Sequence, residues 1–523
     1  MLIGAAAAAP RPRVPTPALV FGLAAALGAL HSLAFLRPWA WPLQLLAVVW
    51  LVAAAARATP RRAALIGLVF GTAWLVAGTW WLYISLHRYG GLPSWMTVLA
   101  VLGLSAFLSL YLAAATGLFA RWRSGRAGAD TLLFGALWLL AEMARAVIFT
   151  GFPWIASGYA HTDAPLRALA PWVGVYGMGF VCAVLAAGVA LAGLQGRRRA
   201  RIALLGTAVM LGGLAALPVP DFTAPTTRFS VTLLQGNVAQ DEKFSHQHLP
   251  QAMAWTQREL LAARGELVLA PETVIPLLPS QLDPAYWQSL IDHFRAGRQA
   301  ALLGLPLGNA AEGYTNSAAG LSADAAALPG GFYRYDKHHL VPFGEFIPAG
   351  FRWFTDLMHI PLGDFNRGPL VAPSFVLRPA AGGVERIAAN ICYEDLFGEE
   401  LAARFVDPAL APTLFANISN IGWFGDTIAI DQHLQISRLR TLEFQRPMLR
   451  ATNTGATVVI DHTGRVTHAL PPYTQGVLDA NVQGRSGITP FAWWAARVGL
   501  AAPAALALVI VALALRRRRG LPS

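Results

Sequence analysis

The sequence predicts a polytopic membrane bundle of about eight transmembrane α-helices joined to an extracytoplasmic α/β domain of layered sheets and helices. Two observations indicate this fold class. Of the 523 residues, 55% are hydrophobic and only 13% are charged, a composition far from that of a water-soluble protein. Long apolar segments occupy both ends of the chain, whereas strand patterns alternate with helical patterns between residues 226 and 485.

Eight apolar segments are long enough to cross a bilayer, which takes about 20 residues per helix. We expect them near residues 17–35, 38–56, 63–86, 94–119, 131–149, 171–194, 201–218 and 493–515. This pattern predicts a membrane domain over residues 1–218 and a catalytic domain over 226–485. A last transmembrane helix with a basic tail is expected over 491–523.

Arginine clusters assign the orientation of the helices. They precede the first segment and follow the second, fourth, sixth and eighth, so all fall on one side of the membrane. The positive-inside rule makes that side cytoplasmic. Both termini are then expected in the cytoplasm, and the catalytic domain in the periplasm. A cleaved signal peptide at the first segment would put every cluster outside, so we expect that helix to be retained.

The charge distribution argues against a nucleic-acid partner. The formal net charge is +12, but residues 226–485 hold more acidic than basic residues. The basic excess therefore belongs to the short loops of the membrane part, where it orients helices. Within one of these helices, Glu142 and Arg145 lie three residues apart. They are expected to form an ion pair, with contact to lipid headgroups as the alternative.

Three residues of the α/β half are candidates for catalysis. Glu272 ends an apolar strand pattern, Lys337 follows Tyr333-Arg-Tyr-Asp, and Cys392 ends the apolar run that begins at Ile387. A thiolate is a far better nucleophile than a thiol. A carboxylate can take the thiol proton, and an ammonium lowers the thiol pKa and stabilises an oxyanion.

The scarcity of lysine strengthens the case for Lys337. Among 40 basic residues, only Lys243 and Lys337 are lysine. A lysine retained in an arginine background suggests a need for a compact ammonium. The other cysteine, Cys182, lies in an apolar segment and is expected to be a core residue.

Other site chemistries find less support in the sequence. His338 and His339 would allow a Cys-His protease or a metal site, but no protease signature, HExxH motif or cysteine-rich partner accompanies them. Walker-type and GxGxxG loops are also lacking. We expect an enzyme without a metal or cofactor.

Three motifs resemble those of the nitrilase, or carbon–nitrogen hydrolase, superfamily. They are Pro-Glu-Thr at 271–273, Lys337 with its trailing His-Leu-Val-Pro-Phe-Gly-Glu, and Asn-Ile-Cys-Tyr-Glu at 390–394. The flanking segments narrow the resemblance to the apolipoprotein N-acyltransferase family, through the motifs Phe149-Thr-Gly-Phe-Pro-Trp-Ile, Leu234-Gln-Gly-Asn-Val, Ile418-Ser-Asn-Ile-Gly-Trp-Phe-Gly-Asp and Arg450-Ala-Thr-Asn-Thr-Gly.

The resemblance implies an αββα sandwich and a role for each candidate residue. Glu272 would be the general base, Lys337 the oxyanion stabiliser and Cys392 the acyl-carrying nucleophile. Supporting positions would be Glu345, Tyr393, Glu394, Trp423 and Phe244. Phe244 departs from the family, which often has tryptophan there.

The implied reaction moves an acyl chain from a phospholipid, through a Cys392 thioester, to the α-amine of a diacylated apolipoprotein. We expect a monomer in the bacterial inner membrane. The leading alternative is a membrane-tethered amidase or nitrilase that uses water as acceptor. A transporter or lipid scaffold with a binding-only domain is a third possibility, against which the complete Glu-Lys-Cys set argues.

Overall fold

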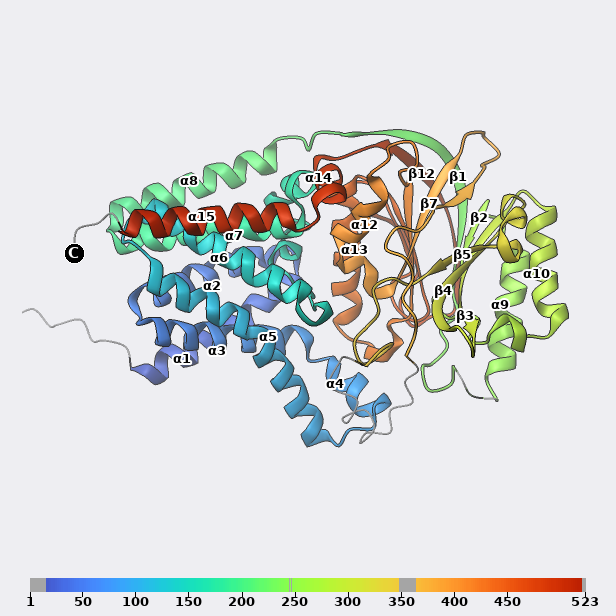
Figure 1. Ribbon diagram of the computed structural model, residues 1–523, viewed down its shortest axis with the longest axis horizontal. Coiled ribbons are helices and arrows are strands. Elements are labelled where there is room, and N and C mark those ends of the chain that lie inside the picture. The colour runs from blue at the N-terminus through green and yellow to red at the C-terminus, as the bar shows by residue number, and fades with distance from the viewer. Residues whose placement is uncertain (1–15, 244, 246, 348–363, 520–523) are drawn as a thin grey trace, which may run out of the picture.

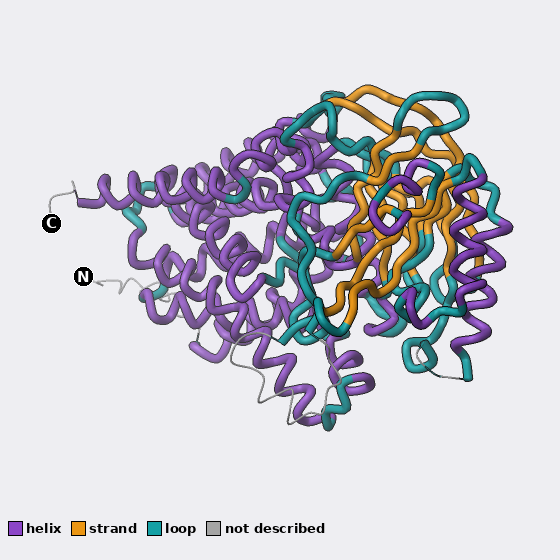
Figure 2. Tube along the Cα trace, turned by 45° about the vertical axis from the view of Figure 1, so that its right-hand side comes forward, coloured by secondary structure: helices purple, strands orange, loops and turns teal. Residues whose placement is uncertain are grey.

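The computed structural model describes residues 16–243, 245, 247–347 and 364–519. A bundle of long helices lies at one end of the molecule, and an α/β sandwich lies at the other (Figure 1). The two parts are in direct contact, as seen from two directions (Figures 1 and 2).

Seven helical segments of the described part are long and apolar enough to span a membrane, and four of them include a short 3-10 turn at one end. The seven are α1 (Pro17–His31), α2 (Trp41–Arg57), α3 (Pro60–Thr79), α5 (Ser94–Trp122), α6 (Ala127–Val147), α7 (Ala170–Leu194) and α8 (Arg197–Ala216). Local sequence fixes where some of them begin. Thr16 and Thr59 cap α1 and α3 with their hydroxyl oxygens, and each is followed by a proline at the first helical position. Between α3 and α5 the chain forms the short helix α4 (Leu82–Ile84).

The last apolar segment, expected to span the membrane near residues 493–515, contains a sharp bend that was not expected. The structure has two helices there, α14 (Pro490–Val498) and α15 (Ala501–Arg519), with an angle of 87° between them. Gly499 ends α14 with a φ of 51°, and Pro503 lies in the first turn of α15. Glycine just after a helix and proline shortly beyond it are a strong stop signal. Only α15 runs along the bundle, while α14 lies at the junction with the sandwich (Figure 1).

The sandwich contains two six-stranded sheets, ordered β12-β1-β2-β3-β4-β5 and β11-β10-β9-β8-β7-β6. The first consists of β1 (Thr223–Gln235), β2 (Leu267–Leu269), β3 (Ala300–Asn309), β4 (Gly313–Leu321), β5 (Tyr333–Asp336) and β12 (Gly476–Gly487). The second consists of β6 (Phe375–Leu377), β7 (Glu385–Ile391), β8 (Leu414–Ser419), β9 (Met448–Thr452), β10 (Val458–Ile460) and β11 (Val466–Ala469). Among the strands of the two sheets, β1-β2-β3 and β7-β8-β9 pair in parallel and the other neighbours are antiparallel.

Helices cover the outer face of each sheet and complete the expected αββα arrangement. Helices α9 (Leu249–Ala262) and α10 (Pro284–Ala296) form the outermost layer, on the first sheet (Figure 1). Helices α12 (Gly398–Ala402) and α13 (Ala429–Phe444) lie between the second sheet and the membrane bundle (Figure 1). The second helical layer is therefore the contact layer between the two domains.

The hydrophobic core follows the same layers. One cluster fills the space between the two sheets, and a second lies between the first sheet and α9 and α10. The third runs without interruption from the membrane helices, through Ile436 and Phe444 of α13, to Phe415 of the second sheet. The membrane domain and the inner half of the sandwich thus share one core.

Candidate active site

Three polar residues meet where β2, β5 and β7 end. Glu272 comes shortly after β2, Lys337 directly after β5, and Cys392 directly after β7. Lys337 Nζ lies 3.6 Å from Glu272 Oε1, and the charges of both residues act on the Cys392 thiol. The structure therefore brings together the three candidates, although β7 belongs to a different sheet from β2 and β5.

Lys337 is a buried ammonium held between two carboxylates. Its Nζ donates a hydrogen bond to Glu345 Oε1 at 2.9 Å and lies 3.6 Å from Glu272 Oε1. Burial alone would lower the pKa of Lys337, but Glu345 and then Glu272 outweigh it and raise the pKa above its ordinary value. The side chain is therefore charged at neutral pH and is only 1% exposed. A fixed cation in a water-poor site is suited to stabilising an oxyanion.

Two asparagines orient the Glu272 carboxylate. The backbone N–H of Asn420 donates to Glu272 Oε2 at 2.8 Å, and Asn316 Nδ2 donates to Glu272 Oε1 at 2.7 Å. Asn316 Nδ2 also donates to Glu345 Oε1 at 2.6 Å. One amide group therefore bridges the two carboxylates that flank Lys337, and its two hydrogens offset part of their mutual repulsion.

Cys392 occupies a strained turn at the end of β7. Its φ is 53°, in the left-handed region that residues with a Cβ rarely adopt. The carbonyl of Cys392 accepts hydrogen bonds from Asn417 Nδ2 at 3.1 Å and from His433 Nε2 at 3.2 Å. Such strain persists where the surroundings over-determine the backbone, which is common at active sites.

The Cys392 thiol is protonated in the resting site. Burial raises its pKa to about 12, and Glu272 adds to the rise, while Lys337 and Arg450 oppose it. The sequence-based expectation that an ammonium favours the thiolate is correct for Lys337, but burial has the larger effect. Attack by the sulfur therefore requires a base to remove the proton as the bond forms.

Glu394 links the lysine segment to the cysteine segment. Its carboxylate accepts hydrogen bonds from the backbone N–H of His338 at 2.7 Å, of His339 at 3.1 Å and of Ile391 at 2.6 Å. The Tyr335 hydroxyl donates a fourth at 2.7 Å. Because these donors flank Lys337 and Cys392, Glu394 sets the separation of the ammonium and the thiol.

Comparison with known proteins identifies the family. Residues 27–188 match the model of the apolipoprotein N-acyltransferase N-terminal domain, and residues 230–489 match that of carbon–nitrogen hydrolases. The chain is 54% identical to an apolipoprotein N-acyltransferase from Verminephrobacter eiseniae, over 92% of each chain. It is 46% identical to one from Ralstonia nicotianae, over 97% of this chain and 96% of that protein.

This chain belongs to the apolipoprotein N-acyltransferase family. It is an acyltransferase of the carbon–nitrogen hydrolase superfamily and a multi-pass protein of the inner membrane. Among solved structures, it is similar to an amidase from Nesterenkonia sp., at 16% identity with a TM-score of 0.36, over 52% of this chain and 95% of that one.

Of the remaining candidates of this N-acyltransferase, Glu345, Tyr393 and Glu394 lie at the three central residues. The Tyr393 hydroxyl donates to the carbonyl of Gly151 in the membrane domain at 3.0 Å. Trp423 is 39% exposed and packs edge-on against Tyr89, with 5.4 Å between ring centroids, so it lies at the rim between the domains. Phe244 lies outside the described residues.

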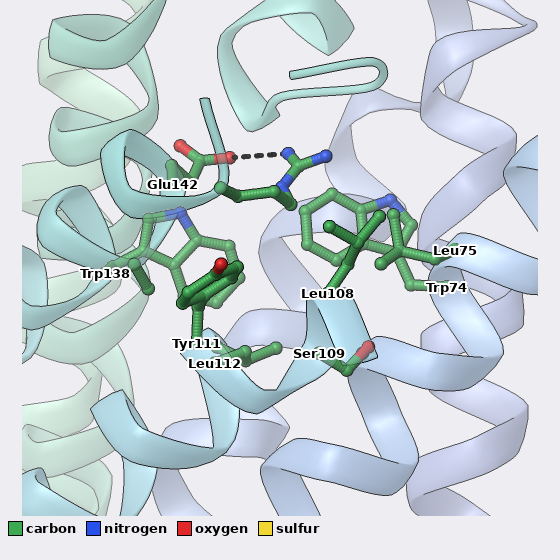
Figure 3. A pocket seen from close by; sticks show the side chains of 11 residues that line it. Trp74, Leu75, Leu108, Ser109, Tyr111, Leu112, Trp138 and Glu142 are labelled. Carbon is green, nitrogen blue, oxygen red and sulfur yellow. Dashed lines mark ion pairs between the residues drawn. The ribbon is translucent and has the colours of Figure 1, made fainter. Parts of the chain in front are cut away.

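A pocket opens in the membrane domain of the N-acyltransferase, between α3, α5 and α6 (Figure 3). Trp74, Trp138 and Tyr111 line it, and the expected pair of Glu142 and Arg145 closes one end, with 3.9 Å between Oε1 and Nη2. Both charged side chains are only 4% exposed. The pocket is thus apolar along its length with a polar end.

Sequence reasoning missed several residues of the site. Asn316 lies on a strand that the sequence did not predict, and its role depends on contacts between distant segments. Lys243 carried a usable signal, because it is the second of the two lysines. It is buried, and its Nζ donates to the backbone carbonyl of Glu272 at 3.1 Å. Burial lowers the pKa of Lys243 to about 8, with Glu272 and Cys392 opposing that effect.

Proposed function

We propose that this chain transfers a fatty acyl group from a membrane phospholipid to the amino-terminal α-amine of a diacylated apolipoprotein, through a thioester on Cys392. Membership of the N-acyltransferase family supports the overall reaction. The observation that carries the mechanism is the buried Lys337 ammonium, fixed by Glu345 and Glu272 beside the thiol.

In the first step, Glu272 removes the Cys392 proton as the sulfur attacks the ester carbonyl of the phospholipid. Lys337 stabilises the oxyanion of the tetrahedral intermediate. The ester C–O bond then breaks, Glu272 returns the proton to the departing alkoxide, and a lysophospholipid leaves. The raised pKa of the Cys392 thiol, caused mainly by burial, supports a proton transfer coupled to attack rather than a standing thiolate.

In the second step, the α-amine of the apolipoprotein attacks the thioester carbonyl, and Lys337 again holds the oxyanion. Glu272 takes a proton from the amine, the C–S bond breaks, and the proton returns to the Cys392 sulfur. The products are an amide and the free enzyme. The two substrates thus react in turn at one site, which is a ping-pong order.

We further propose that the sandwich lies in the periplasm, that both termini lie in the cytoplasm, and that one chain suffices for activity. The arginine clusters in alternate loops support the orientation. Glu272, Lys337 and Cys392 meet within one chain, so the proposed site is complete without a second copy. Both substrates are anchored in the bilayer, in keeping with a catalytic domain that shares its core with the membrane helices.

Mass spectrometry of the enzyme incubated with phospholipid tests the proposal. We expect an acyl adduct on the Cys392 peptide of the wild type and none in Cys392→Ala. Addition of a diacylated lipopeptide should discharge the adduct and give N-acyl peptide. An adduct that persists unchanged in Cys392→Ala would show that the nucleophile has been assigned wrongly.

Hydrolysis is the second candidate, because residues 230–489 match the carbon–nitrogen hydrolases. The same three residues could deliver the acyl group to water. The two functions differ in product when phospholipid is supplied with and without lipopeptide. Free fatty acid in both reactions, without N-acyl peptide, would favour the hydrolase.

A further inference from the structure

Helix α13 contacts both the membrane domain and the nucleophile, through two consecutive residues. Gln432 is 2% exposed and faces the membrane domain. Its Oε1 accepts hydrogen bonds from the indole N–H of Trp81 at 3.0 Å and of Trp154 at 2.8 Å, and its Nε2 donates to the carbonyl of Gly78 at 2.9 Å. One side chain therefore joins the end of α3 to the loop after α6.

His433 is 1% exposed and contacts the catalytic turn. Its Nδ1 lies 2.7 Å from Arg450 Nη2, and its Nε2 lies 2.9 Å from Asp395 Oδ1 and 3.2 Å from the carbonyl oxygen of Cys392. A guanidinium can only donate, so Nδ1 accepts and Nε2 carries the proton. Burial and Arg450 lower the pKa of His433, against the opposing effect of Asp395, so the ring is neutral.

The proton on His433 Nε2 lies where it opposes relaxation of the Cys392 backbone. With a φ of 53°, the Cys392 peptide would move toward negative φ if its carbonyl were released. That movement would turn the thiol away from Glu272 and Lys337. Asn417 Nδ2 donates to the same carbonyl at 3.1 Å, so two side chains from different elements hold it.

The contacts continue from α13 into the membrane pocket. Arg145, at the polar end of that pocket, donates from Nη1 to the carbonyl of Trp154 at 2.7 Å. The indole of Trp154 is bonded to Gln432, and its ring centroid lies 5.5 Å from that of His433. Packed and hydrogen-bonded groups therefore connect the pocket to the nucleophile without a gap.

We propose that α13 aligns the nucleophile with the membrane domain, with Gln432 and His433 as positioning residues for acyl transfer. Gln432 fixes the helix against the rim formed by Trp81 and Trp154, and His433 holds Cys392 by its carbonyl. The inference rests on the proposed function, in which Cys392 carries the acyl group. Contiguity alone does not establish such coupling, so the test must measure it.

Two acyl donors, a phospholipid and a water-soluble ester, distinguish the roles of Gln432 and His433 in the full-length enzyme. Gln432→Leu should slow acylation of Cys392 by phospholipid vesicles about tenfold. Acylation by a short water-soluble p-nitrophenyl ester should change by less than about twofold, because that donor needs no alignment with the membrane domain. The soluble ester also reports that the variant is folded. Gln435→Leu, the same change on a half-buried position of α13, serves as the matched control and should leave both rates unchanged.

A matched pair of amides tests His433. His433→Gln places an N–H near the position of Nε2, whereas His433→Asn reaches only the position of Nδ1. We expect His433→Asn to lower the acylation rate at least about tenfold with both donors, with little change in KM, and His433→Gln to recover part of the loss. The pH profile of Cys392 alkylation by iodoacetamide should shift in His433→Asn and return toward wild type in His433→Gln.

Equal rates in His433→Gln and His433→Asn would overturn the role of His433. If Gln432→Leu slows acylation of Cys392 equally with both acyl donors, or does not slow it at all, the role of Gln432 is wrong. Failure of the proposed function looks different, because the wild type would then carry its acyl adduct away from Cys392. An adduct on Cys392 with no effect of these variants would refute only the alignment by α13.

Discussion

Tyr393 donates its hydroxyl to the backbone carbonyl of Gly151, with an O–O distance of 3.0 Å. The residue after Cys392 is thereby anchored in the membrane domain. Its ring also stacks on Phe152, with 6.5 Å between centroids. The position of Cys392 therefore depends on the loop that follows α6 as well as on the sandwich.

Tyr393→Phe should weaken this anchor without disturbing the packing. The Gly151 carbonyl loses its donor, which typically costs about 1–2 kcal/mol when the group is buried. We expect a lower Tm and slower acylation of Cys392, measured by thermal unfolding in detergent and by adduct formation. Tyr314→Phe provides the control, because Tyr314 is 39% exposed. A Tyr393→Phe enzyme as stable and fast as that control would contradict the anchoring role.

Asn316→Leu should impair catalysis more than stability. The substitution removes the amide that bridges Glu272 and Glu345, so the two carboxylates face each other with only Lys337 between them. We expect a loss of about 10- to 100-fold in kcat, which corresponds to roughly 1.4–2.7 kcal/mol of transition-state stabilisation. Steady-state kinetics with lipopeptide measure it. A change confined to KM would indicate that Asn316 acts on substrate binding instead.

Substitutions of Glu272 and of Lys337 should change the reactivity of the Cys392 thiol in opposite directions. Besides burial, Glu272 raises the pKa of the thiol and Lys337 lowers it. Glu272→Gln should therefore lower the pKa, and Lys337→Met should raise it. Alkylation by iodoacetamide between about pH 7 and pH 10 reports thiolate. We expect Glu272→Gln to react faster than wild type and Lys337→Met more slowly, while both lose acyl transfer. The same direction of change in both variants would refute this electrostatic account.

Lys243 should make the stability of the enzyme depend on pH. Burial lowers its pKa in the folded state to about 8 from an ordinary value of 10.5. As pH falls through this interval, the unfolded chain binds the proton first, so the wild type loses stability relative to Lys243→Met. The difference between the two pKa values corresponds to about 3 kcal/mol of stability that the wild type loses. In Lys243→Met, loss of the hydrogen bond to the Glu272 carbonyl offsets part of the gain. The Tm of Lys243→Met minus that of wild type should increase as the pH falls from about 10 to about 7. A difference independent of pH would contradict this account, because it would mean that the pKa of Lys243 is the same in the folded and unfolded states.

The proximity of Glu272, Lys337 and Cys392 could be predicted because each lies in a short sequence motif. The residues that support them could not be predicted, because they depend on long-range contacts. Asn316 reaches Glu272 and Glu345 from β4, whose glycine, alanine and serine residues lack the β-branched pattern typical of a strand. The αββα fold was correct, but strand patterns near residues 229–236, 266–272, 300–305, 387–391, 414–418 and 456–460 predicted only half of the strands. The strands without such a pattern are β4, β5, β6, β9, β11 and β12.

The last apolar segment shows a different kind of failure, because its bend was not expected. Its hydropathy was high enough, and the error came from ignoring Gly499 and Pro503, whose backbone preferences outweigh the apolar composition of the segment. Lysine scarcity was likewise applied to Lys337 and not to Lys243. In both cases the information was local and present in the sequence.

The hydrophobic core that joins α13 to the membrane helices bears on how the enzyme can be produced and divided. A fragment that begins at β1 would lack the membrane helices that share this core with α13 and would expose the apolar residues packed against them to water. Such a fragment should aggregate rather than behave as a small soluble hydrolase. Because the two halves share this core, we expect them to unfold together although one lies in lipid and the other in water.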